Sequence, residues 1–267
     1  MTAATFRLEL RRSRALIIGL AAVTLLYGGV MAAMYPILKE NQALIDEYMK
    51  VFPQEFLAAF GMVGGTLTDP GVFFNTYLGS MIWPVVAAIG GIILATRTAA
   101  DADRGWLELP LATRLPRSRQ ILAGIAVQVL MLALLAVVCV GGVLGVGLAV
   151  GADWNAGRFL LAAPPIFAFG TAIAALTTLL AVLTLTRGTS AGIAAGALLA
   201  MYLLNAIVTI NPDLGFLAPL GIFNYLHLRS IIDTGTMPWG DLAVLLGVSV
   251  LAWGAAVWRF RERDLLA

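Results

Sequence analysis

The sequence has very few side chains that could carry out chemistry. Its 267 residues include one cysteine and one histidine, and only 12% of them are charged, against about 25% in an average soluble protein. The single cysteine, Cys139, can form neither an intrachain disulfide nor a cysteine-rich metal site, so we predict a small apolar packing residue. No H-E-x-x-H, G-x-S-x-G or cysteine-cluster motif occurs in the sequence. We therefore expect neither a catalytic group nor a metal site.

A phosphate-binding loop is also missing from the sequence. The motif G-x-x-x-x-G-K-[ST] needs a Gly-Lys pair, whereas the two lysines, Lys39 and Lys50, follow Leu38 and Met49. Any nucleotide hydrolysis associated with this protein must therefore take place on another chain.

Long apolar runs make up most of the sequence. Hydrophobic residues account for 60% of it, and windows of about 20 apolar residues, enough to cross a hydrocarbon core as a helix, recur along the chain. Helices are predicted throughout, because backbone groups in lipid must be paired within their own segment. The sequence therefore predicts an all-α, polytopic membrane protein, with residues 1–267 forming a single transmembrane domain. Its six transmembrane helices are expected at about 15–35, 74–96, 121–150, 159–186, 191–210 and 239–258.

Basic residues are concentrated on one side of these spans. Arginines precede the first span, lie between the second and third spans and follow the sixth, whereas the opposite segments contain only Lys39, Lys50, Arg158 and Arg229. By the positive-inside rule, both termini and the segment 97–119 are predicted to face the cytoplasm.

Three segments outside the spans have apolar patterns of their own. Residues 5–14 alternate apolar and basic character, which predicts either a short N-terminal interfacial helix with arginines toward anionic headgroups or a solvated basic tail. Segment 36–75 is polar with apolar residues at helical spacing, so a helix on the outer face is expected. Segment 211–238 is too apolar for a free loop and is predicted to lie on or in the outer leaflet.

Ionisable residues are absent from the middle of the predicted spans, and Asp241 stands only at the edge of the sixth. Because proton- and ion-coupled carriers keep such residues in their spans, this argues against an ion-coupled pump. Hydrogen bonds between helices explain the uncharged polar residues of the spans, and a substrate path is the alternative. The residues predicted for such a path are Gln128, Thr177, Thr178 and Asn205.

Three patches of the sequence resemble one family. The segment 97–119 contains Gly105-x-Leu107-Glu108 after acidic residues and then Pro116-x-Ser118-Arg119. Leu217-Ala-Pro219-Leu-x-x-Phe223-x-Tyr225 precedes the last span, and Phe260-Arg-Glu-Arg263-Asp264-Leu265 lies near the carboxyl end. Together with six spans, this combination resembles bacterial ABC transporter permeases of the type-2 exporter class. One departure is Ile125, where the family often has a lysine.

The resemblance implies a transmembrane subunit of an ATP-binding cassette exporter in the bacterial inner membrane. Such a subunit forms the translocation pathway and performs no catalysis. Two copies of a separate ATPase subunit, which carry ATP and Mg, would dock on its cytoplasmic side, while this chain binds no cofactor itself. A second copy of the chain or a similar permease would complete the unit. Membrane lipid is a further expected partner, and nucleic acid is not.

A cytoplasmic coupling helix between spans two and three is the docking surface that the resemblance implies. Apolar side chains interleaved with charges suit an apolar anchor with a charged rim, and Pro110 limits the helix to short pieces. The predicted docking residues are Asp101, Asp103, Arg104, Gly105, Trp106, Leu107, Glu108, Pro116, Arg117, Ser118 and Arg119.

Two other functions remain open from the sequence. A membrane-embedded enzyme or assembly factor acting on lipid at the outer face would use His227, Asp233 or the segment 36–75. A sensor or scaffold would bind partners without moving a substrate.

Overall fold

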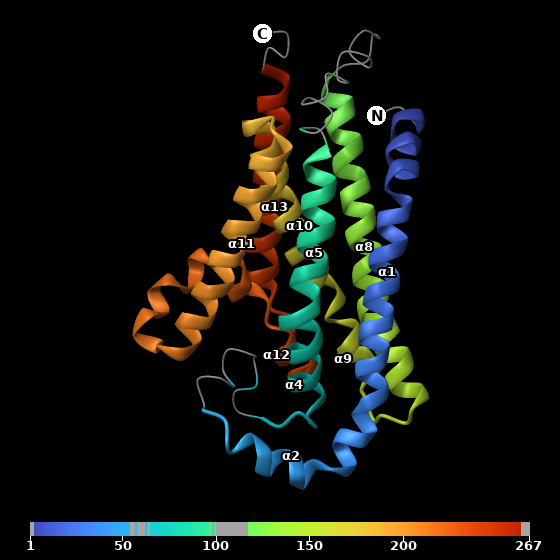
Figure 1. Ribbon diagram of the computed structural model, residues 1–267, viewed down its shortest axis with the longest axis vertical. Helices are drawn as coiled ribbons and strands as arrows, with labels where there is room; N and C mark the ends of the chain where they lie inside the picture. The colour runs from blue at the N-terminus through green and yellow to red at the C-terminus, as the bar shows by residue number, and fades with distance from the viewer. Residues whose placement is uncertain are drawn as a thin grey trace.

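The computed structural model describes residues 3–53, 57, 62, 65–97, 99 and 117–262, and all regular structure among these residues is helical (Figure 1). Six helical segments are long and apolar enough to cross a membrane, which confirms the predicted fold class. They are α1 (Ala3–Glu40), the continuous run α4 (Pro70–Phe74), η1 (Asn75–Ile82) and α5 (Trp83–Ala95), then α8 (Arg117–Ala149), α10 (Ala163–Thr184), α11 (Arg187–Ile210) and α13 (Trp239–Glu262).

The first helix differs from the prediction of a separate interfacial helix. Residues 5–14 continue without a break into the first span, so α1 has 38 residues and is about 57 Å long at 1.5 Å per residue. No glycine or proline separates the two parts, and Phe6, Leu10 and Ile17 share one face against the core. The basic segment therefore stands upright as the first turns of α1.

Helix α10 is the centre of the bundle and α11 is its edge. In the most apolar stretch of Ala156–Thr184, which contains α10, 72% is buried inside the bundle. In the corresponding stretch of Arg187–Ile210, which is α11, only 6% is buried. Helix α10 packs against α5, α8, α11 and α13, while α1 packs mainly on α8. A helix that is apolar all round belongs inside a bundle. The α11 side is left open.

The chain ends lie together at one end of the bundle (Figure 1). This end, here named the terminal end, contains the start of α1, the end of α5, the start of α8 and the end of α13. At the opposite, far end lie α2 (Gln42–Met49), α4, α9 (Ala156–Leu160) and α12 (Leu228–Thr234). The start of α1, the end of α13 and the two residues Arg97 and Arg117 that flank the undescribed segment therefore share one side, as the prediction requires. The predicted coupling helix itself lies outside the described residues.

Aromatic side chains close the far end. The rings of Trp154 and Phe159 stack with centroids 4.7 Å apart, and Tyr35 meets Trp154 edge-on at 4.9 Å. The Tyr35 hydroxyl donates a 2.6 Å hydrogen bond to the carbonyl of Thr68. These contacts fasten the end of α1 to the segment before α4.

The predicted outer apolar segment 211–238 divides into two parts. Leu228, Ile231 and Ile232 of α12 are buried against the bundle. By contrast, the 3-10 helix η2 (Pro212–Leu220) leaves Phe216 and Leu220 exposed, and it is followed by η3 (Ile222–Tyr225). The apolar character therefore serves protein packing in α12 and an exposed surface in η2.

Candidate functional site

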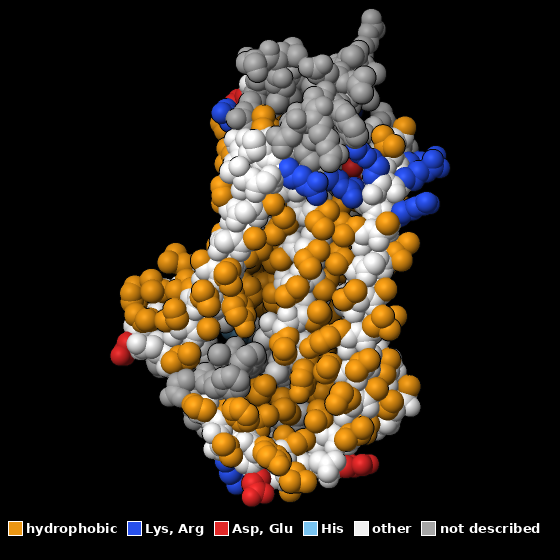
Figure 2. Space-filling model, in the orientation of Figure 1, with side chains coloured by type: hydrophobic (Ala, Val, Ile, Leu, Met, Phe, Trp, Pro, Cys, Tyr) orange, Lys and Arg blue, Asp and Glu red, His pale blue; other side chains and the backbone are white. Residues whose placement is uncertain are grey.

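An apolar groove of about 360 Å³ lies between the second span and the open edge helix α11. Toward the far end α11 leans away from α5 (Figure 1), and the groove lies between them, with α10 behind it and η3 beside it. Figure 2 shows the middle of the visible face to be mostly hydrophobic, with Lys and Arg gathered toward the terminal end. The groove is lined by Ser80, Met81, Pro84, Val85, Ala88, Ile173, Leu198, Leu199, Tyr202 and Phe223.

One wall of the groove is a π-helix, η1, which is continuous with α4 and α5. Pro84 follows it. Because proline has no N–H, the carbonyl of Ser80 cannot receive the usual bond from the residue four positions later, and this favours a local change of helical register. Such π segments occur frequently at functional sites. The π-helix and the residue after it also contain two buried polar atoms without a hydrogen-bond partner in the described structure, Thr76 Oγ1 and Trp83 Nε1.

The groove can hold an apolar molecule with few polar groups. Its lining contains no charged side chain, and the hydroxyls of Ser80 and Tyr202 are its side-chain hydrogen-bonding groups. The ring of Tyr202 lies 5.6 Å from that of Phe223, which also packs edge-on against Phe169 at 5.1 Å. A volume within the 300–1,000 Å³ range of small-molecule sites and an aromatic wall are typical of binding sites for hydrophobic compounds.

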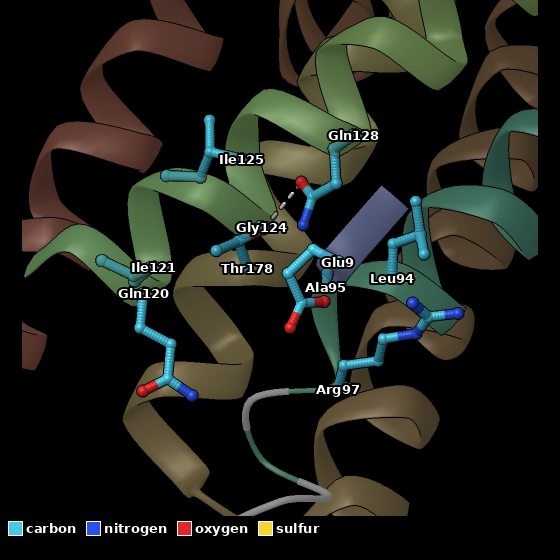
Figure 3. A pocket seen from close by; sticks show the side chains of 10 residues that line it. All are labelled: Glu9, Leu94, Ala95, Arg97, Gln120, Ile121, Gly124, Ile125, Gln128 and Thr178. Atoms are coloured by element: carbon cyan, nitrogen blue, oxygen red, sulfur yellow. Dashed lines mark hydrogen bonds between the residues drawn. The ribbon is translucent and has the colours of Figure 1, made fainter. Parts of the chain in front are cut away.

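A second, smaller cavity lies near the terminal end, between α1, α5, α8 and α10 (Figure 3). Its volume is about 20 Å³, enough for about one water molecule. The hydroxyl of Thr178 donates to Gln128 Oε1 at 3.1 Å, and both residues are buried. The mostly buried Glu9 side chain and Arg97 also line this cavity. It is too small for a transported compound and forms a polar junction between four helices.

Arg97 fastens the end of the second span to α1. Its Nη1 donates a 2.6 Å hydrogen bond to Ser13 Oγ, and its Nη2 donates a 3.2 Å bond to the carbonyl of Arg12. Arg97 is the first residue of the segment 97–119. One end of the predicted coupling segment is therefore attached to the first helix.

The predicted docking residues fall mostly outside the described part of the chain. This holds for Asp101, Asp103, Arg104, Gly105, Trp106, Leu107, Glu108 and Pro116. Arg117 and Ser118 begin α8, and Arg119 is exposed in its first turn. Their docking role stays a prediction.

The four residues predicted for a substrate path are not among those that line the groove. Gln128 and Thr178 meet in the small cavity, Thr177 is buried and donates to the carbonyl of Ile173, and Asn205 is half-buried on α11. The groove is not marked by polar residues in the sequence, because its lining is mostly apolar. The Pro84 ring and the aromatic pair of Tyr202 and Phe223 were the available signals.

Most hydroxyls inside the spans bond within their own helix, which corrects the expectation of helix-to-helix hydrogen bonds. Thr24, Thr177 and Thr184 each donate to the carbonyl four residues earlier, as hydroxyl side chains in helices commonly do. Bonds between spans are seen for Thr178 with Gln128 and for Ser249 with Thr171, at 3.1 Å each. Packing, more than side-chain hydrogen bonding, therefore holds the bundle together.

The polar residues of the far end are engaged with one another. His227 Nδ1 lies 2.9 Å from Asp241 Oδ2, and Arg229 Nε donates to Asp233 Oδ2 at 3.3 Å. Arg158 donates to the backbone carbonyl of Asp233 at 2.6 Å. No group of three or more metal-ligating side chains occurs within the described ranges. These contacts join α12 and the residue before it to α9 and to the start of α13.

One comparison with known proteins covers nearly the whole chain. Residues 2–261 match the family described as "Multidrug efflux system permease Rv1217c, C-terminal domain". No protein with a curated description matches the chain.

Proposed function

Because the chain belongs to the family of the C-terminal domain of the multidrug efflux system permease Rv1217c, we propose that it is the transmembrane subunit of an ATP-binding cassette exporter of the type-2 class. The family supports a transporter permease rather than an enzyme, and the six membrane-spanning helices agree with that. The observation that carries the proposal is the uncharged groove between η1, α5 and α11.

In this proposal the groove receives hydrophobic compounds. Its lining includes Leu199, which is exposed on α11, one of the helices apolar enough to cross a membrane. A compound dissolved in the bilayer would reach it without crossing water, and no lining charge would select for an ionic group. Gln128, Thr177, Thr178 and Asn205 do not line the groove, and their contribution to the path stays a prediction.

The terminal end is proposed to face the cytoplasm and to bind the ATPase. The arginines of the segment 97–119 and the two chain ends support this orientation by the positive-inside rule. Two ATPase subunits with ATP and Mg would dock on the segment 97–119, whose start Arg97 bonds to α1. Movement of the docked segment would then reach α1 and α5 together.

A second permease is proposed to cover the open side of α11. Gly192 and Gly196 of that helix have no neighbouring atom of this chain within 4 Å of the place where a Cβ would be, beyond the helix itself. Small residues four positions apart allow two helices to approach closely in a membrane. A second copy packed there would border the groove on one side.

The experiment fills the groove and measures transport. The chain and its ATPase are reconstituted in vesicles, and export of a neutral hydrophobic fluorescent compound is followed. Leu199→Trp places a large ring in the groove, whereas Leu251→Trp adds the same ring at an exposed position of α13 that does not line it. We expect Leu199→Trp to reduce transport at least tenfold and Leu251→Trp to leave it within about twofold. Equal transport by both variants would remove the groove from the pathway.

A further inference from the structure

Three arginines form a stripe on the outward side of α1. Arg7, Arg11 and Arg14 are all exposed, and their spacing of four and three residues places them on one side of a helix. Leu10 and Ser13 lie on an adjoining face of the helix, turned toward the bundle. None of the three stripe arginines forms an ion pair with another described residue.

The neighbouring Arg12, unlike the three stripe arginines, is paired with an acidic side chain. It lies 3.4 Å from Glu9 Oε1, so the one acidic side chain of this segment is already matched to a base. The positive charge of the stripe is therefore not neutralised by the first turns of α1. It is available to bind an anion.

The stripe leads directly into the lipid-facing side of the same helix. Ile18 is 65% exposed and Leu26 is 69% exposed, although both are large apolar residues inside a membrane span. Arg14 precedes Ile18 by four residues, one turn or about 6 Å. Figure 2 shows basic side chains gathered toward the terminal end above the apolar belt. The arginines thus border the part of α1 that faces hydrocarbon.

The height of the stripe corresponds to the headgroup layer. Arg7 and Arg14 are separated by seven residues, or about 10 Å along α1, and the headgroup layer of one leaflet is about 5–7 Å thick. With Arg14 next to the hydrocarbon boundary, Arg11 lies among the phosphates and Arg7 just beyond them. An interfacial helix lying flat would have spread these arginines along the surface, whereas the upright α1 stacks them through its depth.

We propose that Arg7, Arg11 and Arg14 form a binding surface for an anionic phospholipid in the leaflet at the terminal end. Guanidinium groups bind phosphate oxygens through two parallel hydrogen bonds, and the apolar strip from Ile18 onward contacts the acyl chains of the same lipid. The stripe runs along the side of the helix and joins its lipid-facing strip, so a lipid fits it better than a water-soluble subunit does. This surface is separate from the groove and does not depend on the transported compound.

Bound lipid would also fix the helix to which the coupling segment is attached. Ser13 and the carbonyl of Arg12, which Arg97 binds, lie within the same turns of α1 as the stripe. An anionic lipid on one side of these turns and Arg97 on the other would hold α1 at a constant depth.

The test measures retention of phosphatidylglycerol by the full-length chain in phosphatidylcholine nanodiscs, using native mass spectrometry. The variant tested is Arg7→Gln with Arg11→Gln and Arg14→Gln. The control is Arg259→Gln with Arg261→Gln, which removes two exposed arginines from the last turn of α13, also at the terminal end. At about fivefold in affinity per arginine near an anionic surface, we expect the triple variant to bind on the order of 100-fold more weakly. If every arginine at this end attracted the lipid equally, the double control would lose about 25-fold at the same rate. Because its arginines lie outside the stripe, we expect it to stay within about threefold.

Single substitutions keep the proposal testable if the triple variant inserts poorly. Each of Arg7→Gln, Arg11→Gln and Arg14→Gln leaves most of the basic flank in place and should weaken phosphatidylglycerol binding about fivefold. Unchanged binding in all three, or an equal loss in the α13 control, would overturn the proposal. It would also be overturned if the stripe variants retained lipid normally and lost the ATPase instead, because the stripe would then be a protein interface.

Discussion

Replacing Arg97 should weaken the attachment of the coupling segment to α1 by an amount that can be worked out from two hydrogen bonds. Arg97 Nη1 lies 2.6 Å from Ser13 Oγ and Nη2 lies 3.2 Å from the carbonyl of Arg12. Hydrogen bonds that involve a charged group contribute about 1.5–3 kcal/mol each. Ser13 is fully buried but Arg97 is only half-buried, so water competes for the guanidinium. We expect the Arg97–Ser13 pair to contribute about 1–2 kcal/mol.

A double-mutant cycle isolates this pair. The free energy of unfolding is measured in detergent micelles for Arg97→Met, for Ser13→Ala and for the two combined, because methionine keeps part of the apolar stem. The coupling energy should be about 1–2 kcal/mol. The matched control combines Ser13→Ala with Arg119→Met, an exposed arginine of α8, and should give additive effects. A coupling energy below about 0.3 kcal/mol for Arg97 with Ser13, the usual limit of additivity, would refute the attachment.

Three further predictions concern other parts of the chain. Gly192→Leu with Gly196→Leu should abolish crosslinking of a permease dimer without loss of folded monomer. The control Gly145→Leu, which also faces open space, should leave the dimer intact. A dimer that persists in the double variant would place the second permease elsewhere. Gly71→Ala should lower the free energy of unfolding by about 1–3 kcal/mol, because the added Cβ overlaps a carboxylate oxygen of α12, and unchanged thermal stability would contradict this close packing. Trp106→Ala should reduce co-purification of the ATPase at least fivefold while membrane insertion is unchanged, and full recovery of the ATPase would reject the docking surface.

The six spans could be predicted because their cause is local. A run of about 20 apolar residues has to be a helix in lipid, and α10 and α13 need no partner to be identified. The extent of α1 could not be read in this way, because alternating basic and apolar residues suit an upright helix and a flat one equally. Packing of Phe6 and Leu10 against the core decides between them, and that contact depends on distant helices.

The functional residues were harder to predict for the same reason. Arg97 and Ser13 are 84 positions apart, and neither has a sequence pattern that points to the other. The groove depends on the divergence of α11 from α5, and its lining is no more polar than the lipid-facing surface. Gln128 and Thr178 could be predicted to be polar residues of the spans, but their meeting in a small cavity joins α8 to α10 and could be seen only in the structure.

The central claim is that this chain couples a hydrophobic compound in the groove to ATP hydrolysis on a separate subunit. The most direct measurement is the ATP hydrolysis rate of the ATPase reconstituted with this chain in vesicles, with and without the compound. The claim predicts a severalfold stimulation that Leu199→Trp abolishes and Leu251→Trp retains. A hydrolysis rate that does not respond to this chain, or a stimulation that survives Leu199→Trp, would contradict it.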